Sequence, residues 1–390
     1  MRFELTAEQR AWQEEVRAFL REHLTAEVEA ELATAGGEGR GPLAREFISK
    51  LGARGWWGIG WPKEMGGLGR SATDQYIFIE ELEYAFAPSL HLTITSVAPT
   101  ILRVGSPALQ REWIPRILRG EVDFAIGYSE PSAGTDLASL QTRAVIDGDE
   151  FVISGQKIWN SGAAYATHEW LACRTDPAAP KHRGISLIIV PLDAPGITIQ
   201  SMETWAGFPT YQAFFDQVRV PRENLVGELN RGWEYITMAL DFERVALGSV
   251  GGVRRLLDDL VACCRTTVVD GRPLAAHPHV RLALAELTAD VEAARMLGWL
   301  NAWTIDQGRV PVREASMVKV FAGEVRQKVC DLGLSLLGLH GLIAQGPLAP
   351  LRGRLQRMYR ASPIWRFGGG TNEIQRNIIA RYGLGLPRGD

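Results

Sequence analysis

The decisive stretch of this sequence is Gly127-Tyr128-Ser129-Glu130-Pro131-Ser132-Ala133-Gly134-Thr135-Asp136. Small hydroxyl residues, glycine and proline dominate it, and it has no helical stripe, so the pattern predicts a loop. The loop opens the only long part of the chain with a strand-like period, which runs from Phe124 to Gly227. We therefore expect a β domain in the middle of the chain.

The residues after the loop alternate as strands do. Thr142–Ile146 and Phe151–Ile153 flank Asp147-Gly148, which predicts a β-hairpin whose second arm runs on into Gln156–Gly162. Further strands are predicted at Trp170–Arg174, Ile185–Pro191, Ile197–Met202 and Ala213–Val220. This spacing favours a small antiparallel barrel or sandwich over a parallel sheet.

Helical patterns flank the β region on both sides. Thr6 and Gln9 form a capping-box pattern before an apolar stripe at Trp12, Val16, Phe19 and Leu20. Further N-terminal helices are predicted at Glu46–Ala53, Ala72–Ala85, Leu92–Val104 and Pro107–Leu118. After the β region, helices are predicted at about 232–264, 277–307, 311–337, 351–361 and 372–383. Long helices with short joints indicate a helix bundle.

Size and composition exclude several classes of protein. A chain of 390 residues can bury a large core in two or three domains. The net charge of −3 gives no sign of a nucleic-acid or anionic-membrane partner. The four cysteines are too few for a disulfide scaffold, and no metal-ligand spacing is present. No apolar run approaches the roughly 20 residues that span a bilayer, so we expect a cytoplasmic protein.

One acidic residue departs from the pattern of the bundle. Glu243 shares a helix face with Leu240, Leu247 and Val250. A carboxylate on an apolar face is costly unless it is paired or functional. From position alone, a buried ion pair with Arg244 or another basic residue is favoured over a catalytic role for Glu243, because structural ion pairs are common.

Taken together, these segments resemble the acyl-CoA dehydrogenase family over essentially the whole chain. The loop at 127–136 is similar to the family's first signature, Gly155–Ala163 to its flavin-binding segment in the β domain, and Gly368–Ala380 to its C-terminal signature. The resemblance implies an α+β fold with an N-terminal helical domain (1–122), a central antiparallel β-barrel or sandwich domain (123–229) and a C-terminal four-helix-bundle domain (230–390).

The resemblance also implies a function and a cofactor. It indicates an FAD-dependent oxidoreductase that converts an acyl-CoA thioester to trans-2-enoyl-CoA, the flavin taking the β-hydride and an electron-transfer flavoprotein serving as acceptor. By the match, Trp159 covers the edge of the isoalloxazine ring and Ser161 bonds near its N5. The other residues implied to contact the flavin are Tyr128, Ser129, Gly134, Thr135, Thr371 and Glu373.

The proton acceptor follows a particular branch of the family. Many members carry a glutamate in the last signature, where this chain has Gly369. Glu243 followed by Arg244 instead resembles the isovaleryl- and long-chain-type dehydrogenases, in which the base lies on a bundle helix. The resemblance therefore implies that Glu243 is the base and that the Gly369 N–H binds the thioester oxygen. Asp241 and Arg244 match substrate-side positions.

Two segments depart from the family pattern. Thr267–Gly271 lacks the family's usual phenylalanine and the arginine that reaches a neighbouring subunit's FAD, and Ser335–Leu339 lacks the family's usual glutamine, so the sequence leaves open the contacts of this chain across a subunit interface. We therefore keep open a homotetramer, a homodimer and a heteromer in which this chain is inactive alone. A flavin monooxygenase or nitroalkane-oxidase-like enzyme on the same fold is the other alternative.

Overall fold

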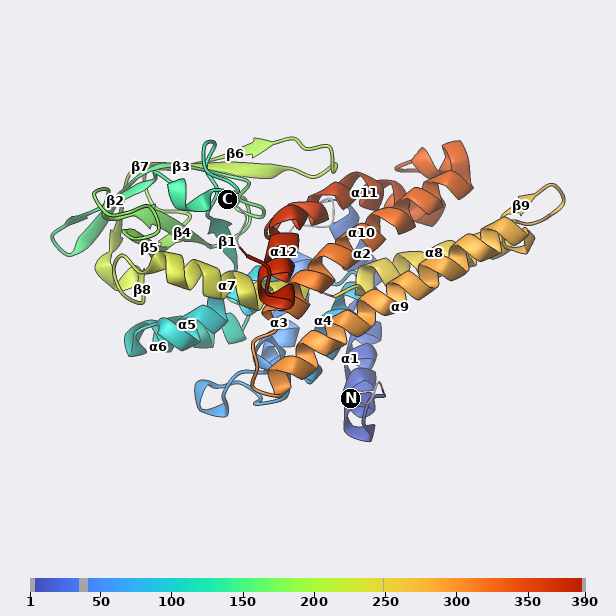
Figure 1. The fold of residues 1–390 in the computed structure, drawn as a ribbon, viewed down its shortest axis with the longest axis horizontal. Helices are drawn as coiled ribbons and strands as arrows, with labels where there is room; N and C mark the ends of the chain where they lie inside the picture. Colours follow the sequence, from blue (N-terminus) through green and yellow to red (C-terminus); the bar gives the residue numbers. More distant parts are fainter. Residues whose placement is uncertain (1–3, 35–40, 248, 388–390) are drawn as a thin grey trace.

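The computed structural model describes the backbone of residues 4–34, 41–247 and 249–387, and the side chains of these residues other than 34 and 241–247. Figure 1 shows a sheet domain at one side and long helices that extend away from it. None of the helices in these ranges combines the length and apolar character needed to cross a lipid bilayer.

The N-terminal lobe is helical. Its helices are α1 (Ala7–His23), α2 (Ala26–Thr34), α3 (Pro42–Ala53), α4 (Ala72–Ala85), the π-helix η3 (Thr93–Val97), α5 (Ala98–Val104) and α6 (Pro107–Leu118). The predicted capping box is confirmed, because Thr6 Oγ1 accepts a hydrogen bond from the Gln9 N–H at 3.1 Å and Gln9 Oε1 accepts one from the Thr6 N–H at 3.0 Å. The predicted apolar stripe of α1 is buried.

The central domain is an eight-stranded sheet. Its strands are β1 (Phe124–Gly127), β2 (Arg143–Asp147), β3 (Glu150–Ile158), β4 (His168–Arg174), β5 (Ile185–Pro191), β6 (Ile197–Met202), β7 (Thr210–Pro221) and β8 (Leu225–Val226). The order is β6-β7-β3-β2-β4-β5-β8, with β1 paired to β4. Most pairs are antiparallel, as expected, and β4 pairs in parallel with β1 and with β2. The predicted hairpin is formed by β2 and β3.

A β-bulge bends β3 between Ile153 and Gly155. Gly155 has φ +153°, and a Cβ at this position would lie 2.6 Å from Thr142 Oγ1. Only glycine fits such a close approach. The bend carries the end of β3 towards the loop at 127–136, where Ile158 N–H donates to Ser129 O at 2.9 Å.

The C-terminal domain contains the long helices. They are α7 (Gly232–Leu247), α8 (Gly251–Thr266), α9 (Pro278–Asp306), α10 (Val312–Leu337), α11 (Arg354–Ala361) and α12 (Asn372–Ile378), which continues as the π-helix η10 (Ile379–Gly383). The short hairpin of β9 (Val268–Val269) and β10 (Arg272–Pro273) connects α8 to α9 at the far tip (Figure 1).

The single helix predicted at 232–264 is wrong, because the chain forms α7 and α8 with a break between them. Val250, the residue before α8, has φ −117° and ψ 16°, which is not helical. The physical reason is a close approach of two backbones: a Cβ at Gly251 would lie 2.2 Å from the Glu80 carbonyl oxygen of α4. A contact between residues so far apart in the sequence has no local signal.

The apolar core lies in three main parts. The largest joins the N-terminal lobe to the outer face of the sheet and is rich in tryptophan, including Trp12, Trp56, Trp57, Trp113 and Trp170. A second fills the bundle around α8, α9 and α10. A third lies inside the curved sheet, among residues of β2, β3, β4, β5 and β7. The lobe and the sheet therefore pack as one unit on which the candidate site is built.

Candidate active site

A buried ion pair holds the first loop of the candidate site. Lys157 Nζ lies 2.9 Å from Glu130 Oε1 and donates to Tyr128 O at 3.0 Å. Glu130 also accepts from the N–H groups of Gln141 at 2.6 Å and Thr142 at 2.8 Å. These bonds fix the backbone of the 127–136 loop against the end of β3.

Burial and pairing act in opposite directions on this pair. Burial by itself raises the pKa of Glu130, but the Lys157 ammonium and the bonds from Thr142 leave that pKa below its ordinary value. Burial lowers the pKa of Lys157, and Glu130 opposes that effect. A buried ion pair of this kind is strongly destabilising when one partner is removed, because the other charge is left uncompensated.

The second loop begins at Trp159, which combines two unusual features. Its φ is +64°, in the left-handed region that costs a non-glycine residue roughly 1–2 kcal/mol. Its side chain is 60% exposed although it is the largest apolar side chain in the loop. A strained, exposed aromatic residue next to a glycine-rich loop indicates a functional constraint rather than packing.

The residue after Trp159 anchors the turn. Asn160 is fully buried, its N–H donates to Tyr211 O at 3.1 Å, and its side-chain amide donates to Ile126 O at 3.4 Å. The same amide donates to Glu169 Oε1 on β4. Ile126 immediately precedes Gly127, so Asn160 connects the second loop to the beginning of the first.

The structure brings most of the residues predicted for the flavin site into these two adjacent loops. Ser129 is half-buried, and Gly134, Thr135 and Ser161 are exposed. Tyr128 differs, because its ring is buried in the core and its hydroxyl accepts from Trp170 Nε1 at 3.0 Å. An exposed indole beside hydroxyl side chains and glycine N–H groups fits a flat aromatic ligand with polar edges, which is the chemistry of a flavin ring.

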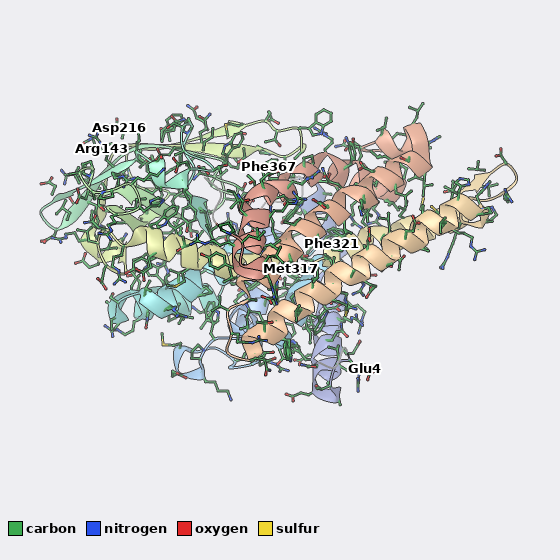
Figure 2. All side chains as sticks on the ribbon, viewed as in Figure 1. Glu4, Arg143, Asp216, Met317, Phe321 and Phe367 are labelled. Carbon is green, nitrogen blue, oxygen red and sulfur yellow. The ribbon has the colours of Figure 1, made fainter. Side chains whose placement is uncertain are left out.

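The residues predicted from the C-terminal signature lie on a different element. Gly369 and Gly370 have φ of +66° and +94°, so this loop needs glycine. Thr371 caps α12 by accepting from the Ile374 N–H at 3.2 Å, and Glu373 lies exposed in the first turn. Phe367, just before the glycines, is 58% exposed and labelled in Figure 2.

This C-terminal loop is held by α10. Lys319 Nζ donates to Asn372 Oδ1 at 3.1 Å, and Arg376 contacts Glu324 Oε1 at 2.5 Å. Both partners are on α10, so the loop with Gly369 is anchored to the long bundle helices rather than to the sheet. In Figure 2, Met317 and Phe321 mark the part of α10 beside α12.

The predicted base and its neighbours lie on α7. Asp241, Glu243 and Arg244 belong to this helix, and their side chains fall outside the described residues. The end of α7 is fixed by its surroundings: Arg326 Nη2 on α10 donates to Ser249 O at 2.9 Å. The roles predicted for these three residues therefore stay predictions.

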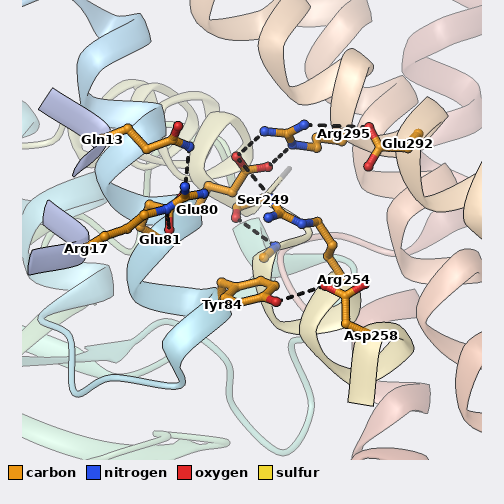
Figure 3. Close-up of polar contacts among 11 residues, drawn as sticks. Gln13, Arg17, Glu80, Glu81, Tyr84, Ser249, Arg254, Asp258, Glu292 and Arg295 are labelled. Atoms are coloured by element: carbon orange, nitrogen blue, oxygen red, sulfur yellow. Dashed lines mark hydrogen bonds and ion pairs between the residues drawn. The ribbon is translucent and has the colours of Figure 1, made fainter. Parts of the chain in front are cut away.

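A polar network surrounds the break after α7 (Figure 3). Glu80 of α4 accepts from Arg295 Nε at 2.7 Å and from Arg295 Nη2 at 3.0 Å, and Arg254 Nη1 lies 3.9 Å from it. Glu81, the next residue, pairs with Arg17 Nη2 at 2.8 Å. The network ties α1, α4, α8 and α9 together around the segment that follows α7.

Sequence reasoning missed Lys157 and Glu169 as buried charged residues. Both lie on strands among residues of the inner core, since Lys157 shares the alternation of Phe151 and Ile153, and Glu169 that of Leu171. A charged residue at an inward position of an alternating strand was the available signal. Glu169 was overlooked because the predicted strand began one residue after it, at Trp170.

Comparison with known proteins agrees with this architecture. The chain matches the acyl-CoA dehydrogenase N-terminal domain over residues 6–121, the middle domain over 125–218 and the C-terminal domain over 230–384. It is 44% identical to acyl-CoA dehydrogenase FadE26 of Mycobacterium tuberculosis (strain ATCC 25618 / H37Rv), with 100% of this chain and 99% of that protein aligned.

Two solved structures are similar over the full length of the chain. One is described as the Tcur3481-Tcur3483 steroid ACAD, with a TM-score of 0.92, 41% identity and 100% of both chains covered. The other is the ChsE4-ChsE5 complex from Mycobacterium tuberculosis, with a TM-score of 0.92, 43% identity and the same coverage. This chain therefore belongs to the acyl-CoA dehydrogenase family of flavoprotein oxidoreductases.

Proposed function

We propose that this chain binds FAD and oxidises an acyl-CoA thioester to its trans-2-enoyl-CoA, with Glu243 as the proton acceptor. The observation that carries the proposal is Trp159, exposed at a strained φ beside Ser161 and held against the 127–136 loop through Asn160. The strain is compensated if a ligand stacks on the indole and accepts hydrogen bonds from the loop.

The chemistry divides among the residues of three elements. Ser129, Thr135 and Ser161 offer hydroxyl donors for the polar groups of the cofactor, and Trp159 covers the edge of its isoalloxazine ring. Bound FAD supplies the two-electron acceptor for the hydrogen that leaves the β-carbon. Glu243 takes the proton from the α-carbon, while the N–H of Gly369 donates to the thioester oxygen and so acidifies that carbon.

Replacing the base is the test of this assignment. Glu243→Gln keeps the shape of the side chain and removes the proton acceptor, so anaerobic flavin reduction by an acyl-CoA should slow by about 10²- to 10⁴-fold with FAD still bound. Glu234→Gln is the matched control, because Glu234 is on the same helix and pairs with Arg231 at the surface. Near wild-type reduction by Glu243→Gln would place the base elsewhere.

The relatives support a narrower proposal about partner and substrate. One similar structure is described as the Tcur3481-Tcur3483 steroid ACAD and another as the ChsE4-ChsE5 complex, and each description names two components. We propose that this chain also works with a second, non-identical subunit and accepts a bulky, ring-bearing acyl-CoA, passing electrons to an electron-transfer flavoprotein. The altered segments at 267–271 and 335–339 fit this arrangement, because a partner would supply the missing cofactor contacts.

Sedimentation and flavin content separate the assemblies. The chain alone should sediment without a full complement of FAD, and co-expression with a candidate partner chain of the same family should restore it. Fully loaded homotetramers that reduce their flavin with straight-chain acyl-CoA as fast as with a steroid-type thioester would overturn both parts of this narrower proposal. The base assignment would remain testable in that homotetramer.

A further inference from the structure

Glu169 is a fully buried carboxyl that lies between the two loops of the candidate cofactor site. On one side it accepts from the side-chain amide of Asn160, the residue between Trp159 and Ser161. On the other side it reaches the start of the first loop, where a Cβ at Gly127 would lie 2.3 Å from Glu169 Oε1. One side chain therefore fills the space that separates the two loops.

The charges around Glu169 are unbalanced. Lys157 on β3 pairs with Glu130 in the first loop, and among the residues that the structure describes Glu169 makes no ion pair. Cys173, further along β4 on the same side, is a neutral thiol because burial raises its pKa to about 12. The strand neighbours of Glu169 are Ala125 on β1 and Val190 on β5, which carry no charge.

The hydrogen bonding of Glu169 also favours a neutral carboxyl group. Among the described residues, Glu169 Oε2 and Asn160 Oδ1 are buried without a hydrogen-bond partner. If Glu169 were ionised, its charge would be buried with a hydrogen bond to only one of the two carboxylate oxygens. Burying that charge would cost far more free energy than burying a neutral carboxyl group.

We propose that Glu169 is a positioning residue of the cofactor site, which in its neutral form holds the Trp159–Ser161 turn at a fixed distance from the 127–136 loop. The inference rests on the proposed FAD binding. The carboxyl acts through Asn160 and through its contact with Gly127, and it does not touch the reacting atoms.

A consequence for pH follows from the surroundings of the carboxyl. Burial raises the pKa of Glu169 to about 8, with Lys157 and the bond to Asn160 opposing the effect only in part. As the pH rises through this value, a negative charge appears between the loops and has no counter-ion. The expected result is that the two loops separate and FAD binds more weakly on the alkaline side.

The experiment measures FAD dissociation constants from pH 6 to pH 9 by fluorescence titration of the protein, with any partner subunit present. In the wild type the constant should rise by about tenfold across the titration of Glu169. Glu169→Gln, which keeps the shape and cannot ionise, should bind FAD like the wild type at pH 6 and stay constant to pH 9. Glu169→Ala should bind about tenfold more weakly at every pH, because the Asn160 amide then loses one of its two hydrogen-bond acceptors.

Controls separate this inference from the function on which it rests. Glu150→Gln removes an exposed glutamate of β3 that pairs with Arg219, and its FAD titration should follow the wild type. A Glu169→Gln protein that keeps the alkaline weakening, or a Glu169→Ala protein that binds like the wild type, overturns the role of Glu169 while FAD binding stands. Wild-type protein that binds no FAD at any pH, with its partner present, overturns the proposed function instead.

Discussion

Two regions of the molecule bury carboxylates completely, and they balance the charge differently. At the interface of the N-terminal lobe and the bundle, Glu80 receives two hydrogen bonds from Arg295 and has Arg254 nearby (Figure 3). Inside the sheet domain, Lys157 pairs with Glu130, while Glu169 accepts a hydrogen bond from the Asn160 amide and makes no ion pair with a described residue. Glu80 thus has arginines beside it, whereas Glu169 has no ion-pair partner among the described residues.

The difference separates a structural cluster from one that borders a candidate site. Fully paired charges with several hydrogen bonds hold helices in register, and pH has little effect on them near neutrality. A carboxyl without a cation keeps a proton instead, and its state can then change within the physiological range. The second kind of cluster lies directly behind the loops with Trp159 and Ser161.

The largest expected effect comes from removing the ammonium group that pairs with Glu130 in the sheet domain. Lys157→Met leaves Glu130 unpaired and takes a donor from Tyr128 O, so the free energy of unfolding should fall by about 3–5 kcal/mol. Urea titration measures the change. Arg219→Met, which breaks an exposed pair on the neighbouring strand β7, is the control and should cost less than about 1 kcal/mol. If Lys157→Met and Arg219→Met lose the same free energy of unfolding, the buried ion pair contributes no more to stability than an exposed one.

Breaking the lobe-bundle cluster should cost somewhat less. Arg295→Met removes two bonds from Glu80, but Arg254 remains 3.9 Å away and can take over part of the pairing. We expect a loss of about 2–4 kcal/mol in the free energy of unfolding, measured in the same urea titration. The double variant with Arg254→Met should lose more than the sum of the two single variants. Simple additivity would contradict a shared role for the two arginines.

The pH dependence of stability tests the protonation of Glu169. The pKa of Glu169 is about 8 in the folded protein against an ordinary value of 4.5, so the folded state binds the extra proton between these values. Stability is therefore highest below the lower value and falls as the pH rises through the upper one. Between about pH 5 and pH 8 the wild type should lose roughly 3–4 kcal/mol more than Glu169→Gln.

The comparison with Glu169→Gln is needed because another buried acid also makes the free energy of unfolding depend on pH in this range. Burial raises the pKa of Glu83, near the lobe-bundle cluster, to about 7. Glu83→Gln is thus the matched variant. Its effect on the pH dependence of the free energy of unfolding should end at a lower pH than the effect of Glu169→Gln. Identical slopes for the wild type and Glu169→Gln would mean that Glu169 is ionised throughout.

The smallest effect concerns the strain at Trp159. Asparagine tolerates the left-handed region better than tryptophan, so Trp159→Asn should raise the free energy of unfolding of the cofactor-free protein by up to about 1 kcal/mol. The same variant should retain FAD less well, because the stacking surface is gone. Retention of FAD at wild-type level would remove Trp159 from the cofactor site.

Much of the fold could be predicted from local patterns. The bounds of β5, β6, α4 and α6 agree with the predicted ranges at both ends, because each has a clear period and a cap or turn beside it. The two loops of the candidate site are likewise readable from their glycine, hydroxyl and tryptophan residues. Their adjacency followed from the resemblance, and the structure shows it through the bond from Ile158 N–H to Ser129 O.

By itself, then, the sequence determined the helices, the strands, the family and the position of the candidate loops, since these depend on residues within a few positions of one another. Only the tertiary structure decided that α7 ends before Ser249, that the Tyr128 ring lies in the core, and that Glu169 lies beside Lys157 without pairing to it. Each of these depends on contacts between distant segments, such as Gly251 against Glu80. Local periodicity contains no information about which distant backbone or charge will lie opposite a residue, because that is settled only when the elements pack.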